Sequence, residues 1–194
     1  GFSFMQDGPL DMRFDPHALQ SAADILNGLP EKDIADFIFR YGEDRDARKI
    51  ARAIVDNRPL HTTRELAAVI ERVSPRRGER IHPATRTFQA LRIAVNRELE
   101  VLPAALEAAV PLLRPDGRLV VISYHSLEDR IVKRFMALER QGCTCPPDFP
   151  VCVCGRVPRI ARVGSQPQVP SHEEVAHNPR ARSARLRAAR RLAA

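Results

Sequence analysis

The fold is decided by one stretch of the chain, LLRPDGRLVVISYHSLEDRIVKR at residues 112–134. Pro115, Asp116 and Gly117 end a helix and turn the chain. Residues 119–122 then form a continuous apolar run rich in β-branched side chains, which is typical of a strand covered on both faces of a sheet. Ser126 is expected to cap a new helix, with Asp129 as the capping-box acid three residues later. The stretch therefore predicts helix, turn, buried strand, loop and helix.

The loop between this strand and the following helix is the candidate site. In an open α/β sheet, ligands bind at the carboxyl ends of strands. Ser123, Tyr124, His125 and Ser126 occupy that position here. We therefore expect the chemistry of the protein to involve these four residues.

Composition and charge narrow the class of partner. The 194 residues carry a net charge of +7, with a pI near 9.9, which favours a polyanionic partner over a neutral metabolite. A basic surface that only keeps the protein soluble, without binding a polyanion, would give the same net charge. The longest apolar candidate, residues 102–113, is interrupted by Pro103, Glu107 and Pro111, so no membrane span is expected. The chain opens on apolar residues without a start methionine, and we expect a further N-terminal part to precede it.

The remaining pattern divides the chain into five segments. Residues 1–16 are expected to be a loop, and residues 17–81 carry apolar positions at helical spacing, as in an all-helical insert domain. Residues 82–140 predict a catalytic α/β core with a parallel or mostly parallel sheet. Residues 141–170 form a Cys/Pro-rich extension with a candidate strand at 159–163. In residues 171–194 a helix is followed by a tail. The helix propensity of its residues favours a helical tail, whereas the alternation of arginine with apolar residues favours a strand.

All four cysteines fall within a dozen positions, at Cys143, Cys145, Cys152 and Cys154. Two Cys-x-Cys pairs on either side of a proline-rich turn can bring four thiolates around one Zn²⁺. The Cys-x-Cys spacing is tighter than the usual spacing of two to four residues, so reduced free thiols remain an alternative. Disulfides are less favoured, because nothing in the sequence indicates an oxidising compartment.

Residues 122–135, ISYHSLEDRIVKRF, resemble the signature of the ribosomal RNA small subunit methyltransferase H family. Three other blocks agree with that family: GFSFM with DGPLDMR within residues 1–13, HPATRTFQA at 82–90 and NPRARS at 178–183. The four blocks occur in the family's order and cover essentially the whole chain. The resemblance implies a cytoplasmic enzyme that uses S-adenosylmethionine to methylate the exocyclic N4 of a cytosine in the decoding region of 16S rRNA, within the small ribosomal subunit.

The resemblance also implies a fold. The chain would be the C-terminal part of a Rossmann-like, S-adenosylmethionine-dependent methyltransferase sheet of the α/β class, with an all-helical insert domain. The strand at 119–122 would be the fifth of seven, and residues 159–163 and 184–190 the last two. In the family, the Gly-rich cofactor loop precedes the block that begins here at Gly1, and no such fingerprint occurs in this sequence. No cofactor contact is therefore assigned to this chain, and the chain alone is expected to be inactive.

The reaction requires particular side chains. The N4 amine of cytosine is a poor nucleophile because its lone pair is delocalised into the ring, so the base must be unstacked, held in line with the methyl group and offered hydrogen-bond acceptors. The candidate catalytic residues are Ser123, His125 and Asp11, and the candidate substrate-binding residues are Tyr124, Ser126, Phe4, Arg86, Arg180 and Arg182.

Some of these roles have alternatives. Tyr124 or Phe4 could stack on the base, and His125 could either relay a proton or anchor its loop. Asp11, close to Arg13, could be a solvated ion pair instead of an acceptor. Glu128 and Asp129 are better suited to stabilising a helix N-terminus through its dipole.

The basic residues admit a second function class. Arg92 and Lys133 join Arg86, Arg180 and Arg182 as candidates for contacts with rRNA phosphates. A non-catalytic, basic RNA-binding or ribosome-associated module, stabilised by zinc, would use the same residues. A homodimer is left open by the sequence.

Overall fold

The computed structural model describes residues 1–75, 82–146, 149–165 and 167–193. The chain forms two compact units, Gly1–Glu98 and Leu99–Ala194. Each has its own apolar core. None of the helices in the described ranges combines the length and the apolar character needed to cross a bilayer.

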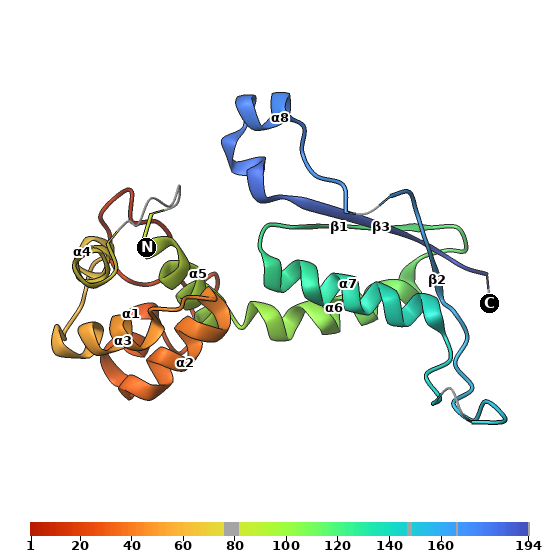
Figure 1. Ribbon diagram of the computed structural model, residues 1–194, viewed down its shortest axis with the longest axis horizontal. Helices are drawn as coiled ribbons and strands as arrows, with labels where there is room; N and C mark the ends of the chain where they lie inside the picture. The colour runs from red at the N-terminus through yellow and green to blue at the C-terminus, as the bar shows by residue number, and fades with distance from the viewer. Residues whose placement is uncertain (76–81, 147–148, 166, 194) are drawn as a thin grey trace. The chain divides into compact units, whose positions relative to one another are not determined.

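The first unit is built from five helices around one core (Figure 1). They are α1 (Ala22–Gly28), α2 (Glu31–Gly42), α3 (Ala47–Asp56), α4 (Thr63–Val73) and α5 (Ala84–Asn96). Capping boxes begin α1 and α4, at Ser21 with Asp24 and at Thr62 with Glu65. The expected helices are confirmed. The last residues of the predicted insert, 76–81, lie outside the described residues, and α5, which the sequence analysis assigned to the α/β core, packs on α2.

The end of α2 involves two residues with different roles. Gly42 is the last helical residue, and Glu43 takes the left-handed conformation, with φ of 49°. A Cβ at Gly42 would lie 2.8 Å from the carbonyl oxygen of Arg86 on α5. Glycine is therefore required here because the two helices approach closely, and the turn itself is made by the next residue.

The second unit is a three-stranded sheet with helices on one face (Figure 1). Its elements are α6 (Glu98–Leu112, which begins at the boundary), β1 (Arg118–Ser123), α7 (Ser126–Gln141), β2 (Ile160–Arg162), α8 (His172–His177), a 3-10 helix (Pro179–Ser183) and β3 (Arg185–Arg191). The strand predicted at residues 119–122 and the helices on either side of it are confirmed. Of the two alternatives for the C-terminal tail, the structure shows the strand.

The direction of the strands corrects the expectation of a parallel or mostly parallel sheet. The order is β1-β3-β2, and β3 pairs antiparallel with both neighbours among the described residues. The C-terminal strand lies between two strands that run in the same direction, so those two strands do not pair with each other. Local sequence patterns do not encode such an insertion.

The two faces of β1 have different surroundings. Leu119 and Val121 pack towards a core that includes Val110 of α6 and Val132 of α7. Val120 and Ile122, on the opposite face, are each 53% exposed. The expectation that the apolar run is covered on both faces is therefore wrong for the described chain, in which helices cover one face only.

A buried ion pair joins the start of α7 to the central strand. Asp129 accepts hydrogen bonds of 2.7 and 2.9 Å from Arg187 of β3, and one of 3.3 Å from Arg185. The hydrogen bond from Arg187 holds the pKa of Asp129 below its ordinary value. Asp129 is therefore not the capping acid that the sequence analysis expected. Its carboxylate turns inward because a buried guanidinium on the neighbouring strand binds both of its oxygens.

Replacing Asp129 with alanine should destabilise the second unit strongly. We expect Asp129→Ala to lower the free energy of unfolding by about 3–5 kcal/mol, because Arg187 would remain buried without its partner. Asp36→Ala is the control, since Asp36 pairs with Arg40 across an exposed face of α2 and should cost less than about 1 kcal/mol. Urea denaturation at neutral pH measures both, and equal losses would contradict the assigned role.

The same pair predicts a pH dependence. The folded-state pKa of Asp129 is lowered, so its contribution to the stability of the fold is complete above the unfolded pKa of about 3.9 and is lost as the pH falls through the folded pKa. The stability difference between the wild type and Asp129→Asn should therefore shrink in acid below that value. A difference that stays constant through this range would contradict the ionised pair.

Candidate functional site

The turn between β1 and α7 carries four of the predicted site residues. Ser123 is the last residue of β1 and is buried, with 2% of its surface exposed. Tyr124 is exposed, the side chain of His125 is buried, and Ser126 is the exposed first residue of α7. The structure thus brings these four residues together at the carboxyl end of the strand, as the sequence predicts.

His125 caps α7. It has an extended backbone, with φ of −139° and ψ of 163°, and its Nδ1 accepts the backbone N–H of Glu128 at 3.3 Å. Glu128 Oε2 in turn accepts the N–H groups of Tyr124 at 2.9 Å and of His125 at 3.3 Å. The predicted cap at Ser126 was therefore one residue too late, because a histidine, which is not a common cap, takes this place.

The cap decides how the imidazole of His125 can act. Since Nδ1 is an acceptor, the proton of the neutral ring is on Nε2, which lies 3.4 Å from Glu128 Oε1. Both ring nitrogens therefore face groups of the first turn of α7. This geometry supports the anchoring alternative for His125, and the proton relay stays a hypothesis.

The hydroxyl of Ser123 differs from the groups around it. Its Oγ is buried and has no hydrogen-bond partner among the described residues. A buried hydroxyl without a partner costs about 1–3 kcal/mol relative to a satisfied one, so functional sites are a common place to find one. Ser123 is therefore the side chain of this turn whose hydroxyl has unused hydrogen-bonding capacity among the described residues.

Phe4 and Asp11 belong to the first unit. The ring of Phe4 stacks on His82, with centroids 4.3 Å apart, and meets Phe88 edge-on at 5.1 Å. Both carboxylate oxygens of Asp11 bind Arg13, at 2.7 and 2.8 Å, and these bonds lower the pKa of Asp11 to about 2. Asp11 is therefore charged at neutral pH and forms the ion pair with Arg13 that the sequence left open as an alternative. Its role as an acceptor and the stacking role of Phe4 stay predictions.

The candidate phosphate ligands differ in availability. Arg92 is bound by Glu98 through two hydrogen bonds of 2.7 and 2.9 Å, so its charge is already balanced. Arg86 is half-buried on α5, and Arg180 and Arg182 are exposed on the 3-10 helix. The last two are the best placed of the candidates for a polyanion.

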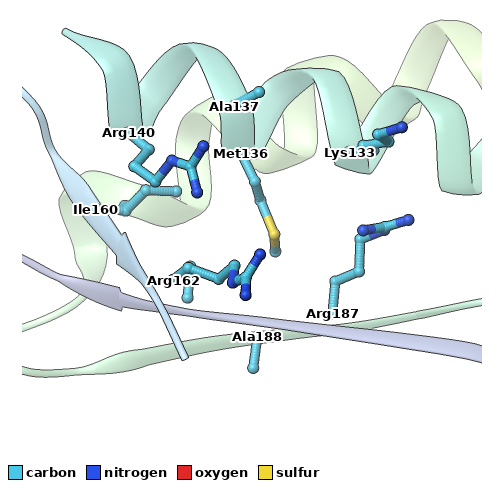
Figure 2. Close-up of a pocket in the computed structure, with 9 residues that line it drawn as sticks. Lys133, Met136, Ala137, Arg140, Ile160, Arg162, Arg187 and Ala188 are labelled. Carbon is cyan, nitrogen blue, oxygen red and sulfur yellow. The ribbon is translucent and has the colours of Figure 1, made fainter. Parts of the chain in front are cut away.

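Lys133 lines a pocket of about 190 Å³ between α7 and the strands β2 and β3 (Figure 2). Figure 2 shows Lys133, Arg140, Arg162 and Arg187 grouped around the side chain of Met136. Arg187 is already paired with Asp129, so Lys133, Arg140 and Arg162 are the cations of this pocket that suit an anionic group. Of the four cations, only Lys133 was a candidate from the sequence. The alternating tail, read as a half-buried strand, places Leu186 and Ala188 inward and Arg187 outward, whereas Arg187 is buried in the structure.

The four cysteines also converge. Their sulfur atoms all lie within 4.8 Å of one another, and all four are free thiols. The cluster lies in the segment between α7 and β2, within the second unit.

A family model for the MraW methylase family matches residues 1–192. The chain belongs to this family. Curated relatives named ribosomal RNA small subunit methyltransferase H include those of Thermomicrobium roseum, 56% identical over 196 residues, and of Dehalococcoides mccartyi, 55% identical over 192 residues. The alignments cover 100% and 99% of this chain but 60% and 55% of those proteins, so the chain spans little more than half of their length. The resemblance read from the four sequence blocks is confirmed.

The cap on α7 can be tested by substitution at one position. We expect His125→Ala to lower the free energy of unfolding by about 1 kcal/mol, because the N–H of Glu128 loses its acceptor, while His125→Asn keeps most of the stability. Amide hydrogen exchange in the first turn of α7 should be faster in His125→Ala by roughly fivefold. Identical exchange in the two variants would show that His125 is not the cap.

Proposed function

We propose that the protein methylates the exocyclic N4 amine of a cytosine in the decoding region of 16S rRNA, within the small subunit of the cytoplasmic ribosome. In this proposal, S-adenosylmethionine is the methyl donor, and the turn at residues 123–126 holds the acceptor base. The observation that carries it is the match, over the whole chain, to proteins named ribosomal RNA small subunit methyltransferase H. Since the chain spans little more than half of those proteins, the activity is proposed for the whole protein.

The described residues fit the acceptor side of this reaction. S-adenosylmethionine, when bound, supplies an electrophilic methyl group. In the part of the chain that the structure describes, the two carboxylates that follow β1 both have partners. Glu128, in the first turn of α7, already accepts two backbone N–H groups, and Asp129 binds Arg187. No glycine-rich turn follows β1 or β2 in the sequence. We therefore assign the acceptor base to this chain and assign no adenosine contact to its residues.

Each residue of the turn has a proposed task. The hydroxyl oxygen of Ser123 accepts an N–H bond of the N4 amine, which lets the nitrogen pyramidalise as its lone pair leaves the ring. Tyr124, with its exposed ring, stacks on the unstacked base. His125 holds the turn in place through the cap, and Ser126 lies beside it at the start of α7. Asp11 and Phe4 remain candidates for a second acceptor and a second stacking ring.

The net charge of +7 supports binding to rRNA. Arg180 and Arg182 offer exposed guanidinium groups, and Arg86 is a further candidate. A non-catalytic RNA-binding module would share this electrostatic character, so charge alone does not separate the two functions. Methyl transfer to small ribosomal subunits by the whole protein separates them.

For the fold, we propose that β1, β2 and β3 are the fifth, sixth and seventh strands of a Rossmann-like sheet. Two features of β1 support this placement. Its one pairing among the described residues is with β3, and Val120 and Ile122 expose an apolar face. A neighbouring strand and a covering helix would satisfy that edge and that face.

The acceptor role can be tested with Ser123→Ala. We expect this variant of the whole protein to fold with unchanged or slightly higher stability, because it removes a buried hydroxyl that has no partner. Single-turnover methylation of small ribosomal subunits should nevertheless slow on the order of tenfold to a hundredfold, since an acceptor used during methyl transfer is lost.

Thr87→Val is the matched control for this variant. Thr87 in the first unit also has a buried hydroxyl without a partner among the described residues, and the proposal gives it no part in methyl transfer. Its variant should methylate at the wild-type rate. An unchanged rate in Ser123→Ala would refute the acceptor role.

The placement of β1 as the fifth strand can be tested by introducing a charged residue on its exposed face, both in a longer protein and in the 194-residue chain. In a longer protein that completes the sheet, Val120→Asp should cost about 2–4 kcal/mol, because it would bury a carboxylate. In the 194-residue chain, where Val120 is half-exposed, the cost should be below ~1 kcal/mol. Val101→Asp, at an exposed position of α6, is the control. Equally small losses for Val120→Asp in both contexts would argue against a covered face.

A further inference from the structure

The loop between α7 and β2 is fixed at its base. Gly142 ends α7 with φ of 71°, and a Cβ there would lie 2.7 Å from Pro158, so the two ends of the loop touch. The buried carboxylate of Glu139 binds both Arg156, at 3.0 Å, and Arg159. The Arg159 N–H also donates to the Glu139 carbonyl oxygen at 2.9 Å. The four cysteines lie in the segment that this clamp closes, between α7 and β2.

Beyond the clamp, the described part of the loop has little apolar packing. Val151 and Val153, which alternate with the cysteines, are 69% and 74% exposed. A short exposed segment of this kind cannot offset its conformational entropy by apolar burial. The convergence of the four sulfur atoms therefore requires another source of stability.

The distances between the sulfur atoms distinguish two possible sources of this stability, a bound metal ion and a disulfide. Cys152 Sγ lies 3.5 Å from both Cys143 Sγ and Cys154 Sγ, and 4.0 Å from Cys145 Sγ. Cys143 Sγ and Cys154 Sγ are 3.8 Å apart. Four sulfurs at about 2.3 Å from one tetrahedral zinc ion would be about 3.8 Å from each other. A disulfide would bring two of them to about 2.05 Å.

We propose that Cys143, Cys145, Cys152 and Cys154 bind one Zn²⁺ in a closed, tetrahedral site that holds the loop between α7 and β2. Four protein ligands leave no open position for a substrate or water, so the role of the ion is structural. Thiolate ligands in a tetrahedral set favour zinc over the harder divalent cations. On binding, each thiol gives up its proton to solvent as its sulfur–zinc bond forms, with no change in oxidation state.

Metal content tests the proposal directly. The 194-residue chain, purified under reducing conditions and dialysed with and without added zinc, is analysed by elemental mass spectrometry. We expect one zinc per chain after exposure to zinc, and less than a tenth of that in Cys152→Ser. Val153→Ser is the matched control, because it places a serine between two ligands without removing a sulfur, and it should retain one zinc. Equal loss in both variants, or iron in place of zinc in the wild type, would overturn the proposal.

A measurement on the unmodified chain remains decisive if the serine variant does not fold. A mercurial titration of the native thiols, followed with a zinc-sensitive dye, should release one zinc as four thiols react. Replacement of zinc by Co²⁺ should give the intense visible bands of a tetrahedral thiolate site. Four thiols that react without releasing zinc, or an intact mass that is four hydrogens lower through two disulfides, would contradict the site.

Discussion

The arrangement of the second unit depends on the buried ion pair between Asp129 and Arg187. Asp129 lies in the first turn of α7, and Arg187 lies on β3 opposite Val121 of β1. The pair therefore joins the helix that follows the turn to the strand that is paired with β1. Strand β3 therefore holds the turn at residues 123–126 at both of its ends. The Ser123 hydroxyl is positioned by these interactions, although it takes part in none of them. The cap made by His125 and Glu128 fixes the turn a second time, from its own backbone.

The ion pair and the helix cap use some of the hydrogen-bonding groups around the turn and leave others available to a ligand. Glu128 is used by the N–H groups of Tyr124 and His125. The Ser123 hydroxyl and the exposed ring of Tyr124 are not used in this way, and they are the parts suited to a ligand. A site made of one rigidly held acceptor and one exposed ring is adequate for holding an unstacked base. The zinc site, at the other end of α7, would stabilise the loop that leads to β2.

Much of this could be predicted from local sequence. The helices of the first unit follow from apolar spacing and capping residues, and the strand at residues 119–122 follows from its β-branched run. The cysteine cluster was predictable because the four cysteines are close in sequence. The features that were missed depend on distant partners. The direction of β3, the pairing of Asp129 with an arginine 58 positions away and the neutralisation of Arg92 by Glu98 require knowledge of which segments meet. The cap at His125 was missed because histidine is an uncommon cap. The domain boundaries and the roles of the site residues stay predictions.

The central claim, that the turn at the end of β1 receives the amine of a cytosine, is tested most directly by nuclear magnetic resonance on the whole isotopically labelled protein. Cytidine and uridine are titrated in parallel, since uridine carries a carbonyl oxygen where cytidine has the exocyclic amine. The account predicts saturable shifts of the amides of Ser123, Tyr124 and His125 with cytidine and much smaller shifts with uridine. Equal responses to the two nucleosides, or shifts confined to residues away from this turn, would contradict it.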